Sequence, residues 1–533
     1  MIQGGGFYFY SHSYTEAGKE KENEKRRNSL LSQQTMAQLL TAAYAEDRRN
    51  NMMYPDLQAV RIYAETYTRI PVYTVLDYEQ DDILDLYAML RGPYSFFLES
   101  GVLNSYGRYS IIALPCNKRL ISNDGTTRLI QHGEAIQLDG NPLDILKKEM
   151  QESAPIYPEL PVFSGGAIGH FNYDMIRLFE PIQDHQLPSL ELPLMQFAFV
   201  QELLVLDHEQ HRLYIIVNMQ TQNEELKTAY QKAVKRILEL KDRISCRKPY
   251  YGNPVAKRSV TSSMDKKQFM DKVGRAQEHI HEGDIFQVVL SQRMEAAYTE
   301  DPLDAYMQLR KLGKSPYMYY LDFDEYVIAG ASPELLLKGR GRSIMTMPIA
   351  GTRPRGANEQ EDHKAAQSLL EDPKENAEHN MLVDLGRNDI GKVSETGSVR
   401  VQHMKQVQHY SHVMHMTSEV HGQLKEGCDI FDALASVLPA GTLSGAPKIS
   451  AMNIIEKLEP VKREIYGGAI GFLGYNKQFD ACITIRTFVF HKHKVYLQAG
   501  AGIVKDSIAE KEYEETMQKA KALLRAIHAE VAI

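Results

Sequence analysis

The segment PIAGTRPRG, Pro348–Gly356, and the segment AEHNMLVDLGRNDIG, Ala377–Gly391, are the parts around which the sequence is organised. The first contains two glycines, two prolines and two arginines, and it follows a strand-like run over Ser343–Met347. Glycine and proline favour turns, so this composition predicts a turn-rich loop. Backbone N–H groups and guanidinium groups in such a loop can converge on an anion. The loop is therefore a candidate anion-binding segment.

The second segment predicts a helix that carries an unusual carboxylate. Pro373 suits the first helical turn. Apolar residues then recur at every fourth position, at Ala377, Met381 and Leu385. Glu378 lies one turn before Leu382, at the edge of that apolar face. A carboxylate at this position either loses hydration without compensation or serves as a ligand, for example to a metal ion. A basic loop and an acidic helix together suggest an anionic substrate held through a metal ion.

Composition excludes several classes of protein. The 533 residues carry a net charge of −8 that is spread without long blocks, which argues against nucleic acid or an anionic membrane as the main partner. No apolar run reaches transmembrane length and the N-terminus has no signal-peptide core, so we expect a cytoplasmic protein. The four cysteines are far apart and show no metal-binding spacing, which predicts reduced thiols.

The order of the predicted elements indicates four regions. Residues 1–52 have little apolar periodicity and predict a disordered extension or a mis-assigned start. Residues 53–246 predict a first domain, 247–263 a polar, proline-bearing linker, and 264–533 a second domain that begins with a helix capped by Ser263.

Strands and helices do not alternate regularly in this sequence, so we expect an α+β fold rather than a doubly wound sheet. Strands are predicted at 94–99, 285–293, 326–329, 343–347, 469–475, 481–490 and 495–500. Helices are predicted at 82–90, 223–244, 263–281, 303–312, 361–370, 374–385, 430–436, 446–458 and 510–528.

Three further motifs carry a family resemblance: GTLSGAPK (Gly441–Lys448), CITIRT (Cys482–Thr487) and QAGAGIV (Gln498–Val504). Together with the first two segments they resemble the large subunit (component I) of anthranilate synthase, among the chorismate-utilising enzymes. The resemblance runs from about Asp56 to Ile527. It implies layered antiparallel sheets with helices outside and a site in a cleft.

The implied activity is that of a lyase in the first step of tryptophan biosynthesis. Chorismate and ammonia would give anthranilate and pyruvate, with Mg²⁺ as cofactor and tryptophan as feedback inhibitor. Ammonia would come from a glutamine amidotransferase subunit (component II), because no cysteine of this chain lies in a glycine-flanked nucleophile elbow. The implied assembly is a heterotetramer of two large and two small subunits.

The resemblance assigns the metal ligands and the proton-transfer groups. Glu378 and Glu515 match the magnesium ligands, which suits a hard cation that binds carboxylate oxygens. Glu515 points away from the apolar stripe of the last helix, so by itself it reads as an ordinary solvated glutamate. Glu334 matches the general acid that protonates the departing hydroxyl, and a leucine run after it predicts partial burial and a raised pKa. His415 matches a group that handles or orients a proton in the second half-reaction.

The substrate carboxylates require cationic and amide donors. Arg486 ends an apolar strand, where a buried guanidinium needs either a substrate carboxylate or a structural ion pair. The resemblance implies further chorismate contacts at Gly351, Thr352, Tyr466 and a turn formed by Gly500, Ala501 and Gly502.

Two positions separate the members of this family. Gln287 stands where the water-using isochorismate synthases have a lysine that can act as a base, so glutamine indicates ammonia as the nucleophile. Ala350 stands where many aminodeoxychorismate synthases have a lysine that reacts covalently. The aminodeoxychorismate synthase large subunit remains the alternative, and a catalytically inactive tryptophan-binding regulator is a second one.

An effector site is implied at two distant segments. Ser100 at a predicted strand end and Pro316, Tyr317 and Met318 match the tryptophan-contacting residues of the resembling proteins. Without the resemblance, Ser100 is an ordinary turn residue. The two segments fall in different predicted domains, so a ligand bridging them would bias how those domains sit.

Overall fold

The computed structural model describes most of the chain after residue 51. The described ranges are 52–80, 82–101, 107–123, 125–185, 187–222, 224–410 and 413–531. The predicted extension, residues 1–52, lies outside them except for Met52.

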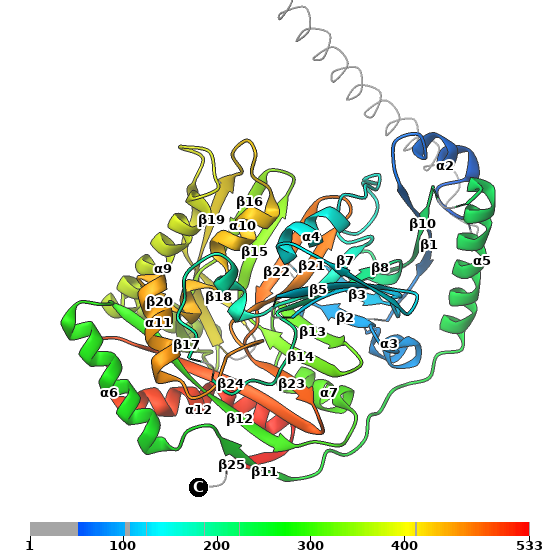
Figure 1. Ribbon diagram of the computed structural model, residues 1–533. Helices are drawn as coiled ribbons and strands as arrows, with labels where there is room; N and C mark the ends of the chain where they lie inside the picture. The colour runs from blue at the N-terminus through cyan, green and yellow to red at the C-terminus, as the bar shows by residue number, and fades with distance from the viewer. Residues whose placement is uncertain are drawn as a thin grey trace, which may run out of the picture. The chain divides into compact units, whose positions relative to one another are not determined.

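The described strands form two large sheets (Figure 1). The first has 13 strands, in the order β1 (Arg69–Asp77), β10 (Arg212–Gln220), β9 (Glu202–Asp207), β3 (Tyr109–Ala113), β2 (Phe96–Glu99), β13 (Tyr317–Asp322), β14 (Tyr326–Ser332), β23 (Thr487–His491), β24 (Lys494–Ile503), β12 (Gln287–Ala297), β11 (Arg258–Ser262) and β25 (Ala529–Val531), with β20 (Gly445–Ala446) beside β12.

The second sheet has 12 strands, in the order β17 (Ile349–Pro354), β19 (Val413–Gln423), β16 (Ser343–Thr346), β15 (Leu335–Arg340), β22 (Gln478–Ile483), β21 (Ala469–Gly474), β7 (Gly166–Phe171), β8 (Met195–Val200), β4 (Lys118–Asn123), β5 (Thr126–Gln131) and β6 (Glu134–Leu138), with β18 (Arg400–His409) beside β19. The described pairs are antiparallel except β11 with β25. One core cluster contains Tyr319 and Ile328 of the first sheet and Ile168 and Ile470 of the second, so it lies between the sheets.

Helices cover the outer faces of the two sheets. They are α2 (Leu57–Tyr63), α3 (Leu84–Leu90), α4 (Pro142–Glu149), α5 (Leu226–Ser245), α6 (Lys266–Glu282), α7 (Pro302–Leu312), α8 (Glu359–Glu371), α9 (Pro373–Gly391), α10 (Ile430–Val437), α11 (Lys448–Leu458) and α12 (Ala509–Ala526), with short 3₁₀ turns η1 (Tyr173–Leu178) and η2 (Gly441–Leu443). Helix α5 packs on β10, α12 on β24 and α6, and α9 on β17 and β19 (Figure 1). The predicted α+β class, with layered antiparallel sheets and helices outside, is confirmed.

Strands from both predicted domains lie in both sheets. In the first sheet Leu98 of β2 is opposite Tyr319 of β13. In the second, Gly169 of β7 is opposite Gly471 of β21. Residues 53–533 form one compact unit, and the predicted linker at 247–263 contains strand β11. The ranges 53–246 and 264–533 therefore share their sheets. The sequence did not indicate this, because pairing between distant strands leaves no local pattern.

Several local predictions need correction. Asp265 rather than Ser263 caps α6, because its side chain accepts from the backbone N–H of Gln268 in a capping box. The predicted loop at Pro348–Gly356 is mostly strand β17, whose pairing shifts beside Gly351 at φ 71°. The predicted strand over 481–490 is split into β22 and β23, because Arg486 adopts φ 52° between them.

The buried face of α9 also differs from the prediction. Ala377 is exposed, and Met381 and Leu385 are only half-buried. The buried residues of this helix are His379, Leu382, Val383, Asp389 and Ile390. The apolar pattern does not include His379 because histidine is polar, yet its ring is fully buried and shares a hydrogen bond between Nε2 and the Ser418 hydroxyl, 2.6 Å apart. The helix was predicted correctly, but its buried residues are shifted by one to two positions from the predicted apolar ones.

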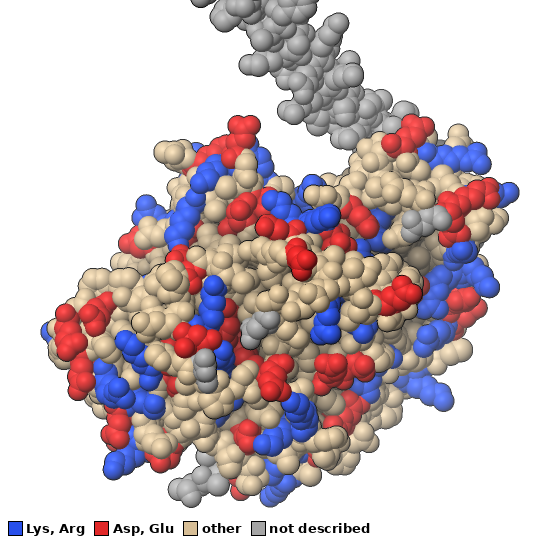
Figure 2. Space-filling model, viewed as in Figure 1, with Lys and Arg blue, Asp and Glu red and all other residues tan. Residues whose placement is uncertain are grey.

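The visible surface carries charges of both signs. Figure 2 shows Lys and Arg interspersed with Asp and Glu over the face drawn, without one sign gathering over any element. This matches the even spread of charge in the sequence. Among the described residues, no helix combines the length and the apolar character that a membrane span requires.

Candidate active site

The predicted catalytic, substrate and metal residues converge on one region at the ends of β12, β14, β22 and β24. Helices α9 and α12 supply the two glutamates, and β17 and β19 supply Gly351, Thr352 and His415. Contacts between these groups, described below, connect all of them. The structure therefore assembles in space what the sequence presents over more than two hundred residues.

Arg486 forms no ion pair with any residue in the described part of the chain. Its left-handed backbone, φ 52°, lies at the break between β22 and β23. A terminal guanidinium N–H donates to the backbone carbonyl of Lys519, and no carboxylate of the described residues forms an ion pair with it. Burial lowers its pKa, while Tyr466 and Glu515 act in the opposite direction. An incompletely paired, half-buried guanidinium can bind a carboxylate through two hydrogen bonds.

The glycines at 500 and 502 lie inside β24 rather than in a turn, which corrects the prediction. Gly500 is opposite Ser291 and Gly502 is opposite Val289 of β12. A Cβ at Gly500 would lie 2.9 Å from the Tyr466 hydroxyl, and one at Gly502 would lie 2.7 Å from Nε2 of Gln287. A Cβ at Gly500 would also lie 2.8 Å from the carbonyl oxygen of Leu290, so a side chain at either position would have to displace its neighbours. Ala501 between them is fully buried.

Two carboxylates from different helices approach each other. Burial raises the pKa of Glu378 on α9, and the charges of Glu375 and Glu515 raise it further. Glu515 on α12 forms an ion pair with Lys519 at 2.6 Å. Neighbouring carboxylates repel unless a cation lies between them, so these two groups offer the hard oxygen donors that Mg²⁺ prefers.

Glu334 has the environment of a general acid. It lies in the connection from β14 to β15 and is 7% exposed. Burial raises its pKa to about 7, and Thr442 and Lys519 counteract this rise. Glu334 and Thr442 line a cavity of about 40 Å³ together with Asp389. A carboxyl group with this pKa is partly protonated near neutral pH, as a proton donor must be.

His415 is held as a neutral base. Its Nδ1 lies 3.0 Å from the carbonyl oxygen of Gly351 and 3.0 Å from the hydroxyl of Thr352. A carbonyl oxygen only accepts, so Nδ1 carries the hydrogen and Nε2 keeps its lone pair. Burial lowers the pKa of His415, and the charge of Arg486 lowers it further. The ring can therefore accept a proton at Nε2.

Lys519 belongs to the site and was missed in the sequence. Its ammonium group pairs with Glu515 and donates to the carbonyl of Gly500 at 2.9 Å. The two residues are four apart on α12, so they lie on one face of that helix. Once Glu515 is taken as a site residue, the four-residue spacing predicts that Lys519 lies beside it.

Some buried polar atoms at the site lack a hydrogen-bond partner within the described part of the chain. Oε1 of Gln287 and the hydroxyl of Thr484 are among them. Buried polar atoms are nearly always paired in native proteins, so unpaired ones at a site are available to a ligand. The Gln287 amide is 5% exposed and lies beside Gly502.

The predicted effector residues lie together on neighbouring strands. Glu99 of β2 is opposite Met318 of β13, which places Ser100 beside Tyr317 and Pro316. Ser100 is half-buried, and the N–H of the next residue donates to the carbonyl of Ser315 at 2.8 Å. The two segments are neighbours in one sheet. A ligand here would therefore not bridge two separate domains, contrary to the expectation from the sequence. Residues 102–106 lie outside the described ranges.

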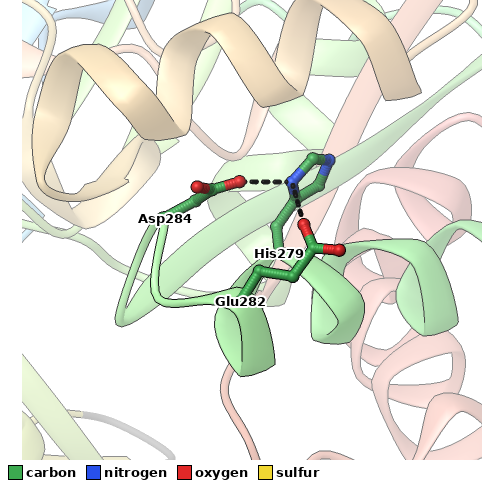
Figure 3. A group of neighbouring side chains, drawn as sticks. All are labelled: His279, Glu282 and Asp284. Carbon is green, nitrogen blue, oxygen red and sulfur yellow. Dashed lines mark hydrogen bonds and ion pairs between the residues drawn. The ribbon is translucent and has the colours of Figure 1, made fainter.

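A separate group of titratable residues ends helix α6 (Figure 3). His279 Nδ1 lies 2.8 Å from a carboxylate oxygen of Asp284 and 4.0 Å from one of Glu282. Gly283 takes the left-handed conformation, φ 85°, and the Asp284 N–H donates to the His279 carbonyl at 3.0 Å. These contacts are those of a helix C-terminus, and they account for the cluster without a ligand.

Comparison with known proteins places this geometry in a family. The model of the family described as chorismate binding enzyme matches residues 95–525. Anthranilate synthase component 1 of Acetivibrio thermocellus is 44% identical over 490 residues, covering 89% of this chain and 99% of that protein. The protein of the same name from Aquifex aeolicus is 40% identical over 480 residues, covering 88% and 97%.

Solved structures agree with the fold. Anthranilate synthase component I from Streptococcus pneumoniae superposes with a TM-score of 0.70 at 35% identity, covering 90% of this chain and all of that one. The menaquinone-specific isochorismate synthase MenF from Escherichia coli gives a TM-score of 0.66 at 19% identity, covering 89% and 98%, and shows the shared fold alone.

Proposed function

The chain belongs to the chorismate binding enzymes, among the anthranilate synthase component 1 proteins, and from this premise we propose how its site makes anthranilate. The observation that carries the proposal is the meeting of three features: an arginine with no ion pair among the described residues, two carboxylates close enough to interact electrostatically, and a partly protonated glutamate. Arg486 binds a carboxylate of chorismate. The glycine strand Gly500–Gly502 and the Tyr466 hydroxyl form the wall beside it.

Glu378 and Glu515 would hold Mg²⁺, with substrate oxygens completing its shell. The bound cation would supply positive charge that holds and polarises the ring carboxylate. Lys519 balances the charge of Glu515 and ties α12 to Gly500. This places the two carboxylates next to the arginine that binds the same substrate.

Gln287 selects the nucleophile. Its Oε1 has no partner among the described residues and can accept an N–H of ammonia. A glutamine cannot remove a proton from water, whereas ammonia is nucleophilic enough to attack without first losing a proton. Ammonia attacks ring carbon C2, the ring double bonds shift, and the 4-hydroxyl leaves as water with the proton of Glu334.

The second step restores aromaticity. His415 Nε2 removes the proton from C2 as the bond from the ring to the enolpyruvyl oxygen breaks. The released enolate takes up a proton to become pyruvate, and the ring becomes anthranilate. Glu334 is buried and His415 is half-buried, which limits the exchange of their protons with bulk solvent.

The ammonia comes from a partner subunit. Component 1 implies a second component, and we assign it as a glutamine amidotransferase in a heterotetramer of two large and two small subunits. Burial raises the pKa of Cys116 to about 12 and also raises that of Cys482. These two thiols do not ionise near neutral pH, so they are not glutaminase nucleophiles.

Regulation follows from the neighbouring strands β2 and β13. Tryptophan, the end product of the route that begins with anthranilate, binds at Ser100, Pro316, Tyr317 and Met318 in this proposal. The enzyme acts in the cytoplasm, where chorismate and glutamine are available. The alternative activity, that of an aminodeoxychorismate synthase large subunit, uses the same substrates.

One product assay tests the proposal. The purified chain is supplied with chorismate, ammonium salt and Mg²⁺, and the products are separated and identified. Anthranilate and pyruvate in equal amounts are expected. Aminodeoxychorismate without pyruvate would overturn the proposal in favour of the alternative, and isochorismate would overturn the role of Gln287.

A further inference from the structure

A buried ion pair lies directly behind the substrate pocket. Glu459 follows the last residue of α11, and Arg463 lies four residues later. Both side chains are 2% exposed. The guanidinium Nε donates to Oε2 of Glu459 at 2.8 Å, and a terminal N–H donates to Oε1. Neither residue has a role in the reaction described above.

The pair makes four further hydrogen bonds, and all of them reach other segments. Oε1 of Glu459 accepts from the backbone N–H and from the hydroxyl of Ser291, both at 2.8 Å. Arg463 donates to the carbonyl of Leu443 at 2.5 Å and to that of Val289 at 2.7 Å. All three guanidinium nitrogens are therefore engaged.

Each of these contacts leads to a residue of the site. Ser291 is opposite Gly500, and Val289 is opposite Gly502, in the β12–β24 pair. Leu443 follows Thr442, which lies beside Glu334.

Arg463 also holds Tyr466, because its carbonyl accepts from the Tyr466 N–H at 3.0 Å and its guanidinium lies 5.6 Å from the centre of that ring. One ion pair thus joins the glycine strand, the Gly441–Leu443 turn and the substrate-facing tyrosine.

Packing alone does not fix these distances. A cavity of about 30 Å³ is lined by Arg463, Tyr466 and Thr484 among others. Side chains around a void lose contacts on that side, so directional bonds must set the spacing there. Apolar residues can often replace a buried ion pair without loss of stability, so stability alone does not explain why charge is buried here.

We propose that Glu459 and Arg463 are positioning residues that set the spacing of the glycine strand, Tyr466 and the turn at Thr442, and so determine affinity for the carboxylates of chorismate. This inference rests on the proposed function of the site. Removing the pair widens or tilts the pocket, even in a protein that remains fully folded.

The test compares single and double replacements. Arg463→Met leaves a buried, unpaired carboxylate and should lower both the thermal midpoint and activity. The double variant Glu459→Met with Arg463→Met removes both charges. We expect its thermal midpoint to return close to that of the unaltered protein, while kcat/KM for chorismate stays at least tenfold lower, mostly through KM.

A matched control uses a second, mostly buried pair outside the site. Arg258 and Glu300 pair at 2.6 Å with side chains 8% and 23% exposed, and Arg258 also donates to the carbonyls of Ala297 and Ile527. The double variant Arg258→Met with Glu300→Met should keep the KM for chorismate within about twofold. Restored kcat/KM in the Glu459 and Arg463 double variant would show that the pair is only structural and would overturn the proposal.

Ser291→Ala keeps the proposal testable if the double variant does not fold. It removes the hydroxyl that donates to Glu459 and accepts from Gln498 at 2.8 Å, and leaves the ion pair in place. Because the Gln498 amide loses its acceptor, we expect a modestly lower thermal midpoint together with a severalfold higher KM, and an unchanged KM would refute the inference.

The rise in thermal midpoint caused by chorismate reports on the pocket without turnover. It should be smaller in the double variant, and an undiminished rise there would count against positioning. Failure of the unaltered protein to make anthranilate would count against the proposed function instead.

Discussion

Glu334→Gln should make the protein more stable and less active, and the stability gain should depend on pH. The side chain is buried, and its pKa is raised from 4.5 to about 7. Because the folded state holds its proton more tightly than the unfolded state does, it binds more protons between these two pH values. The stability of the unaltered protein therefore falls as pH rises through this window, and the loss is complete above about pH 7.

The size of the effect follows from the two pKa values. A rise from 4.5 to about 7 corresponds to about 3 kcal/mol of destabilisation at pH 8, as an upper figure. Glutamine has nearly the same shape and does not ionise. At pH 4 the carboxyl group is protonated in both states, so the variant and the unaltered protein should then differ little in free energy of unfolding.

The same shift defines the catalytic consequence. With a pKa of about 7, about half of the molecules carry the Glu334 proton at pH 7, against roughly 0.3% for an ordinary glutamate. Turnover should fall about tenfold per pH unit above pH 8 if this proton is used. Loss of a general acid should lower kcat by about 10² to 10⁴ in the glutamine variant.

Denaturant unfolding at several pH values and the ammonia-dependent rate are the two assays. Free ammonia must be held constant across the pH series by adjusting total ammonium, because ammonium itself titrates. A stability difference that does not change with pH would show that Glu334 ionises at its ordinary pKa. Full activity of the glutamine variant would remove Glu334 from the role of acid.

Three further predictions concern the metal, the nucleophile and the effector. Glu378→Gln or Glu515→Gln should lower turnover by orders of magnitude at ordinary Mg²⁺ concentration, because each removes one of two interacting carboxylates, and near-normal rates in either would contradict the proposed metal site. With chorismate and Mg²⁺ but without ammonia or partner, the unaltered protein should yield no isochorismate by chromatography, since Gln287 cannot activate water. Ser100→Phe should weaken tryptophan inhibition at least tenfold and change kcat and KM only a few-fold, and an unchanged tryptophan titration would exclude this effector site.

Much of the candidate site could be predicted from the sequence, because its residues lie in short motifs whose roles transfer one by one. Arg486 is an example, since a cationic residue at the end of an apolar segment predicts a negatively charged partner. The predicted conformations were less accurate: Gly500 was placed in a turn but lies in β24. A glycine in the sequence is compatible both with a turn and with a strand that another side chain crosses closely. Only the position of Tyr466 in the structure distinguishes these two cases.

The arrangement of the sheets could not be predicted in the same way. Hydrophobic patterns marked most strands and helices to within a few residues, because each depends on local periodicity. The pairing of β2 with β13 joins residues more than two hundred positions apart, and nothing local specifies it. Lys519 and Glu459 were missed for a related reason, since their partners lie on other segments and a charged residue in sequence looks solvated.

The shared sheet changes how the proposed inhibition by tryptophan would reach the active site. Tyr317 is opposite Ser332, two residues before Glu334. The Ser332 hydroxyl donates to the carbonyl of Ile483 at 2.6 Å, and the Ile483 N–H donates to the carbonyl of Glu334 at 3.0 Å. A ligand that displaces Tyr317 would therefore act on β14, which ends two residues before the proposed acid, without a rotation between separate domains. In this proposal one strand pair couples the effector to the acid, and only a small shift of β14 is required.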